Sequence, residues 1–241
     1  MTNWADIQHC YGSAEDIPAL LDALTPDRSS EAWSDLWGCV CHQGSVYAAS
    51  AAVLPHLRAL AQQWTPVDRL QPLVLAGAIV ASNDPSADFD IAPFRQDIDE
   101  LAALADDALT TTGLTQEDFI YLMQASLALH GHAQWGRHLD RMCDGERFHA
   151  RCPSCDADLE VALQPGGVSH LRLEGEDEAD GNAIEPTPPA ALTGIGQRLH
   201  RLATSDQQDV ADKLCSLFGH AACPACAQRL PVADAIAKGD E

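Results

Sequence analysis

The chain has 241 residues, 46% of them hydrophobic, which is enough to bury one sizeable core or a core with a small appended module. Fourteen basic and 36 acidic residues give a formal net charge of −22, and such a field repels phosphate backbones and anionic lipid headgroups. We therefore expect no binding to nucleic acid and none to membranes, for which the sequence also lacks an apolar run of about eighteen residues.

Two features predict a cytoplasmic protein. Residues 1–6 contain no basic segment followed by an apolar stretch, so they do not resemble a secretory signal. The nine cysteines are an odd number, and four of them form two Cys-Pro-x-Cys pairs. In a reducing compartment, thiols at this spacing are more often metal ligands than disulfides.

Residues 1–147 are predicted to be helices joined by short turns. Ser13 with Asp16 predicts a capping box that opens a short helix through Leu24. Ser30 predicts the N-cap of a second helix, over residues 31–41.

A longer helix is predicted to begin at Ser45, after Gly44 as the C-terminal cap of the helix before it. Its apolar side chains recur at three- and four-residue spacing, as on one helix face: Val46, Ala49, Val53, Leu57, Leu60 and Trp64. Pro55 falls within this pattern and is expected to kink the helix or to move its start.

Further helical patterns follow in the same region. Residues 73–81 are apolar on all sides, which predicts deep burial, and residues 97–109 are amphipathic. Thr115 predicts a cap for a helix through residue 130, and a short helix over 133–142 comes next. Helices in succession without strand-like alternation predict helix-on-helix packing, and their pairing suggests a HEAT-like α-α superhelical stack.

The pattern changes at Phe148, so residues 148–241 are predicted to form a second region. Residues 159–163 and 168–173 alternate on either side of a Pro-Gly-Gly turn, which predicts a β-hairpin. Five acids among residues 174–180 predict a solvated linker or mobile loop. Two helices then follow, over 190–203 and after a capping box formed by Ser205 and Gln208, before a short tail.

The two Cys-Pro-x-Cys pairs predict one structural zinc ion, bound by Cys152, Cys155, Cys223 and Cys226. Two residues between cysteines let both thiolates of a tight turn point at one ion, and four thiolates leave no open position for water or substrate. The first pair with its hairpin is the local form of a zinc ribbon. A thioredoxin-like redox site would need a βαβ context that this sequence lacks.

Sixty-seven residues separate the two pairs, which is far more than in a compact ribbon. This insertion is tolerable because the entropic cost of closing a loop grows only logarithmically with its length. His220 and Cys215 remain alternatives for one of the four ligands.

A second distinctive segment, from Trp33 to Leu60, contains Trp-x-x-Leu-Trp, His-Gln-Gly and Leu-Pro-x-Leu. It resembles a segment of bacterial HEAT-repeat-like proteins in which these motifs recur at this spacing, and the Cys-Pro-x-Cys hairpin is similar to a ribbon insertion of such proteins. The resemblance implies an α-superhelix used for binding, of the kind found among immunity proteins of polymorphic toxin systems.

These observations favour a non-enzymatic binding protein, an immunity protein or antitoxin that occludes a basic cognate toxin. The sequence shows no Gly-rich phosphate loop, His-Glu-x-x-His or Gly-x-Ser-x-Gly motif. Candidate partner-binding residues lie at a helix–helix turn and in the acidic segment: His42, Gln43, Glu174, Glu176, Asp177 and Glu178. For the turn, the alternative is that its side chains only satisfy neighbouring backbone groups. An enzyme with an unrecognised active site and a scaffold unrelated to toxins remain alternative functions.

Overall fold

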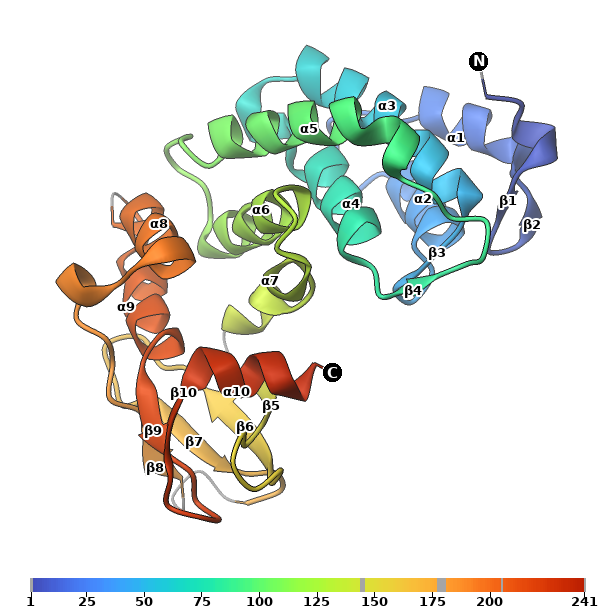
Figure 1. The fold of residues 1–241 in the computed structure, drawn as a ribbon. Coiled ribbons are helices and arrows are strands. Elements are labelled where there is room, and N and C mark those ends of the chain that lie inside the picture. The colour runs from blue at the N-terminus through green and yellow to red at the C-terminus, as the bar shows by residue number, and fades with distance from the viewer. Residues whose placement is uncertain (1, 144–145, 177–180, 205, 241) are drawn as a thin grey trace. The chain divides into compact units, whose positions relative to one another are not determined.

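The computed structural model describes residues 2–143, 146–176, 181–204 and 206–240. The chain folds as two compact units, Met1–Leu139 and Asp140–Glu241, which are described separately below. The first unit is built from helices, and the second combines helices with two small antiparallel sheets (Figure 1). The prediction of a mainly helical protein is confirmed, whereas the HEAT-like superhelix stays a prediction. No helix within the described ranges is both long and apolar enough to cross a membrane.

The first unit places its helices in chain order with short connections. They are α1 (Ile17–Asp22), α2 (Glu31–Val40), α3 (Ala48–Gln63), α4 (Leu70–Ala81), α5 (Arg95–Ala108), α6 (Gln116–Leu129) and α7 (Ala133–His138). Four short elements precede α1: η1 (Trp4–Asp6), β1 (Gln8–His9), β2 (Gly12–Ser13) and η2 (Ala14–Asp16). Four more lie between later helices: β3 (Ser45–Val46), η3 (Pro66–Asp68), β4 (Asp84–Pro85) and η4 (Ala92–Phe94). Strands of two residues are too short to leave a period-two pattern, so the sequence did not predict them.

Helices α4 and α6 form the centre of this unit. Leu73, Leu75 and Ile79 of α4 are completely buried, as the all-apolar pattern predicted. A Cβ atom on Gly77 would lie 2.8 Å from the Cα of Ala125, so the two helices approach as closely as backbone allows. The absence of a side chain at this glycine therefore sets the packing of the core.

Two predicted helix starts differ from the structure. Ser13 is the N-cap residue of η2, which continues into α1 at Ile17, but its side chain makes no capping bond. Ser45 lies in strand β3, and α3 begins at Ala48, where the backbone N–H of Tyr47 donates to Ser50 Oγ at 2.7 Å. At Ser45 the pairing of β3 with β4 takes the place of the predicted first helical turn.

Other local predictions fare differently. Thr115 caps α6 as predicted, with its Oγ1 accepting the backbone N–H of Asp118 at 3.1 Å. Helix α3 continues through Pro55. Gly44 is not the cap of α2, which ends at Val40 with Cys41 as its C-cap. The φ of 90° at Gly44 instead belongs to a turn closed by the bond from Ser45 N to His42 O. The predicted box at Ser205 lies outside the described residues.

The second unit begins with η5 (Leu139–Met142), which spans the division, and contains a sheet in the order β5-β6-β7-β8. Its strands are β5 (Phe148–Arg151), β6 (Asp158–Ala162), β7 (His170–Leu173) and β8 (Asn182–Ala183), all antiparallel. The β6–β7 pair is the predicted hairpin. After η7 (Pro189–Ala191) come α8 (Gly194–Ala203), α9 (Gln208–Leu217), a second pair of strands, β9 (His220–Ala222) and β10 (Arg229–Pro231), and α10 (Val232–Gly239).

Helix α10 lies across the sheet beside β5 (Figure 1), where the sequence predicted only a short tail. A Cβ on Gly239 would come within 2.8 Å of the Cα of Ala150, so helix and strand are in close contact. Val232 and Ile236 are buried on the same side of the helix. This contact brings the C-terminal helix next to the first Cys-Pro-x-Cys turn.

Candidate metal centre

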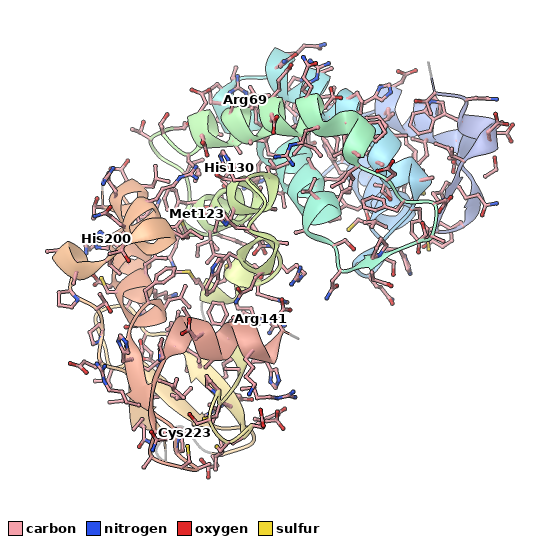
Figure 2. The ribbon with its side chains drawn as sticks, in the orientation of Figure 1. Arg69, Met123, His130, Arg141, His200 and Cys223 are labelled. Carbon is pink, nitrogen blue, oxygen red and sulfur yellow. The ribbon has the colours of Figure 1, made fainter. Side chains whose placement is uncertain are left out.

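Each Cys-Pro-x-Cys pair forms the tip of a two-stranded hairpin. The first tip joins β5 to β6, where Arg151 pairs with Asp158, and the second joins β9 to β10, where Ala222 pairs with Arg229. Each tip thus holds six residues between its last paired positions. Figure 2 shows Cys223 at the end of the small sheets away from α8 and α9.

The two tips have the same backbone geometry. In the first, the N–H of Cys152 donates to Ala157 O at 2.9 Å and that of Asp156 to Cys152 O at 3.1 Å. In the second, Cys223 N donates to Gln228 O and Ala227 N to Cys223 O, both at 2.9 Å. The residue after the second cysteine is left-handed in each tip, with φ of 59° at Asp156 and 60° at Ala227.

The four sulfur atoms face one another across the tips. Cys152 Sγ lies 3.9 Å from Cys226 Sγ, and Cys155 Sγ lies 3.9 Å from Cys223 Sγ. All four lie within 4.8 Å of one another. A tetrahedron with metal–sulfur bonds of about 2.3 Å has edges of about 3.8 Å, whereas a disulfide needs about 2.05 Å. The predicted ligand set is therefore assembled with the spacing of a four-coordinate ion, and the four cysteines could bind one metal ion.

Backbone N–H groups prepare the sulfurs to carry negative charge. Burial raises the pKa of the Cys152 thiol. The N–H groups of Ser154 and Cys155 and the neighbouring thiols lower this pKa by more than burial raises it, so that its final value is about 7. The bond from Ser154 N to Cys152 Sγ measures 3.4 Å. Thiolates that accept such bonds are better metal ligands, because the charged form is stabilised before the metal arrives.

The second tip supplies the matching N–H groups to Cys223, from Ala225 and Cys226. Burial nevertheless raises the pKa of the Cys223 thiol to about 12, and the nearby thiols of Cys152 and Cys226 add to the rise. A cluster of thiols without a cation cannot ionise together, since each new charge repels the others. A divalent cation would replace these protons and make the four-thiolate state stable.

Lys238 of α10 adds a positive charge beside the first tip. Its Nζ donates to the carboxylate of Asp156, to Cys152 O at 3.3 Å and to Pro153 O at 3.5 Å. The Lys238 ammonium is the main reason that the pKa of Asp156 lies below its ordinary value. The C-terminal helix thus holds the turn that carries two of the four ligands.

The two alternative ligands lie elsewhere in the second unit. Cys215 is buried in α9, where burial raises the pKa of its thiol, and His220 pairs with Pro231 and Glu185 in the strands. Neither joins the four-cysteine cluster found within the described ranges. Four thiolates would fill the four positions of a tetrahedral ion, so the arrangement matches that of a closed site.

The first unit holds a second group of possible ligands, His9, Asp16 and Cys39. No local motif predicts this group, because its members come from β1, η2 and α2. His9 Nδ1 accepts the N–H of Tyr11 at 3.0 Å, so the ring proton must sit on Nε2, which donates to Asp16 Oδ1 at 3.0 Å. Both nitrogens are thereby engaged. Burial raises the pKa of the Cys39 thiol, and Asp16 adds to the rise. We interpret the group as a buried structural hydrogen-bond network.

The predicted partner-binding residues belong to both units of the chain. His42 and Gln43 lie in the turn after α2, where Gln43 is exposed with a φ of 51° and Tyr11 OH lies 3.3 Å from His42 Nδ1. Glu174 and Glu176 follow β7 in the other unit, and the carboxylate of Glu176 accepts the N–H of Leu173 at 3.3 Å. Asp177 and Glu178 lie outside the described residues.

Comparison of the chain with protein-family models, with curated proteins and with solved structures finds no match.

Proposed function

We propose that the four cysteines bind one Zn²⁺ ion as a structural staple. The supporting observation is the sulfur spacing of 3.9 Å between the two tips, together with four soft sulfur donors and no open coordination position. Cys152, Cys155, Cys223 and Cys226 would hold the ion, which supplies a cross-link between two hairpins. The chain's own contribution is the pair of turns and their N–H groups, which orient the sulfurs.

We further propose that the protein binds a basic protein partner. The observation that supports this proposal is the negative charge of the helical unit. Residues 1–139 contain 18 acidic residues against five arginines, a balance of −13. Negative potential of this size speeds the approach of a basic surface and excludes acidic ones.

All five arginines of this unit are engaged within the protein. Four bind carboxylates and one binds a carbonyl oxygen: Arg28 with Asp118, Arg58 with Asp97 and Glu100, Arg69 with Asp107, Arg95 with Asp99, and Arg137 with Ala81 O. The unit therefore presents the remaining carboxylates without compensating arginines. Exposed side-chain charge of one sign favours a partner of the other sign.

The resemblance of Trp33–Leu60 to bacterial HEAT-repeat-like immunity proteins leads us to the specific form of the proposal. The protein would act in the cytoplasm as an antitoxin that covers the basic surface of a cognate toxin. Binding would need no catalysis, and its strength would depend on ionic strength, because exposed charge pairs are screened by salt.

The experiment is to isolate the tagged protein from its native cells at moderate salt and to identify what co-purifies. The proposal predicts one stoichiometric basic protein that high salt releases and whose toxicity this protein abolishes when the two are co-expressed. An acidic partner, a complex that resists high salt, or isolation without a partner would contradict it.

A further inference from the structure

A groove crosses the first unit at the N-terminal ends of α2, α4 and α6. It consists of two adjoining hollows of about 770 and 310 Å³. The hollows share four lining residues, Arg28, Leu70, Gln71 and Asp118. The larger hollow lies within the size range of pockets that bind a side chain or small ligand.

The wall of the larger hollow is aromatic. Trp33, Trp37 and Tyr121 line it together with Val74. Trp33 is held in place, because its Nε1 donates to Thr25 O at 2.9 Å and its ring packs edge-on against Trp64 with centroids 6.0 Å apart. A fixed aromatic wall accepts a flat or cationic group at little entropic cost.

The rim of the same hollow is acidic. Glu31 and Glu117 are exposed, and their carboxylates make no hydrogen bond or ion pair with the described part of the chain. The third carboxylate, that of Asp118, binds Arg28 Nη1 at 2.5 Å. Arg28 therefore shows that a guanidinium fits at this rim. The carboxylates of Glu31 and Glu117 could bind another cation.

We propose that this groove receives a basic segment of the partner protein, with one arginine or lysine side chain in the larger hollow. Its aliphatic stem would pack against Trp37 and Tyr121, and its charge would lie at Glu31 and Glu117. An anionic ligand would meet three carboxylates against one arginine, and an apolar ligand would bury those carboxylates without a partner, which is costly. The inference rests on the proposed function, since it locates where a basic partner docks.

The test measures binding of a fluorescein-labelled hexa-arginine peptide by anisotropy, at a low salt concentration of about 50 mM, where charge interactions are weakly screened. The variant Glu31→Gln/Glu117→Gln removes both rim charges and keeps side-chain size, so folding is not at risk. The matched control, Glu15→Gln/Asp22→Asn, removes two exposed charges of the same unit that lie away from the groove. Trp37→Leu tests the wall while keeping an apolar side chain.

We expect the groove variant to weaken peptide binding about tenfold or more, and Trp37→Leu to weaken it severalfold, because a cation over an aromatic ring is lost. The control should change binding by no more than about twofold, as for a general field effect. Equal weakening by both charge variants would contradict the proposal that the groove is the docking site. The proposal of a basic partner would not be affected by that result. No binding by the unmodified protein would overturn both proposals.

Discussion

The two Cys-Pro-x-Cys tips reach the same backbone geometry from different surroundings. The first is flanked by charge, with Arg151 Nε bound to Asp158 at 3.2 Å and Lys238 bound to Asp156. The second is flanked by Ala222 and Arg229: Asn182 Nδ2 donates to Ala222 O at 3.0 Å, and Arg229 binds Glu185 at 2.9 Å. The shared features are the cysteine spacing, the proline and the left-handed residue, so these set the turn.

The difference shows what each tip depends on. Helix α10 holds the first turn itself through Lys238 and Asp156, whereas no ion pair of the described residues involves positions 223–228 of the second turn. We infer that the metal contributes proportionally more to the order of the second tip. Substitutions and acid distinguish the contributions to stability that both tips share from those that only one tip has.

The largest effect should come from removing a ligand in either tip. Cys152→Ser and Cys223→Ser are each expected to abolish stoichiometric zinc binding and to destabilise the second unit by at least about 3 kcal/mol, because structural zinc contributes directly to folding. Zinc analysis and thermal unfolding measure both effects. Cys215→Ala, outside the cluster, should keep its zinc, and loss of zinc in this control would contradict the assignment.

Acid should remove the metal next. With the pKa of Cys152 at about 7 and those of Cys155 and Cys223 raised, several thiols of the metal-free protein carry protons at neutral pH. Zinc must displace these protons, so its affinity should fall as the pH falls, by more than tenfold per unit between about pH 8 and pH 6. Competition with a chromophoric chelator measures this slope. An affinity independent of pH would exclude thiolate ligation.

Loss of the helix contact should affect the first tip alone. Lys238→Met keeps the stem of the side chain but removes the bonds to Asp156, Cys152 O and Pro153 O. We expect a melting temperature slightly below that of the unmodified protein, because the Asp156 carboxylate is mostly exposed and its pair is screened by water. Amide hydrogen exchange should rise at residues 152–156 and not at 223–227; a uniform rise would contradict local tethering.

The smallest expected effect is a gain in the stability of the second unit. Ala227 has a φ of 60°, where a Cβ atom is strained and glycine is not. Ala227→Gly is therefore expected to stabilise the second unit by about 1 kcal/mol, measured by denaturant unfolding of the metal-loaded protein. Ala225→Gly, at a position without positive φ, should destabilise it slightly. The opposite order would show that the turn geometry is not as described.

The metal ligands could be predicted from the sequence because residue type and local spacing define them. Each Cys-Pro-x-Cys pair is a complete turn, and the structure needed only to bring two such turns together. The β6–β7 hairpin was readable for the same reason, since its turn and both strands are contiguous. Burial of most of residues 73–81 followed from composition alone.

Features that depend on distant contacts could not be read from the sequence. Strands β5, β9 and β10 have three or four residues each, too few for a periodic signal, and α10 follows Pro231 without a side-chain cap. The start predicted at Ser45 was wrong because residues 45–46 pair with Asp84–Pro85, which lies about forty positions away in the sequence. The walls of the groove come from three helices, so no single segment of the sequence predicts it.

The most direct test of the account is the metal content of the purified native protein. Elemental analysis with native mass spectrometry should find one zinc ion per chain, and cobalt substitution should give the intense sulfur-to-cobalt charge-transfer and tetrahedral d–d absorption of a four-thiolate site. A chain that is folded without metal and binds neither ion would contradict the central claim that one ion joins the two tips.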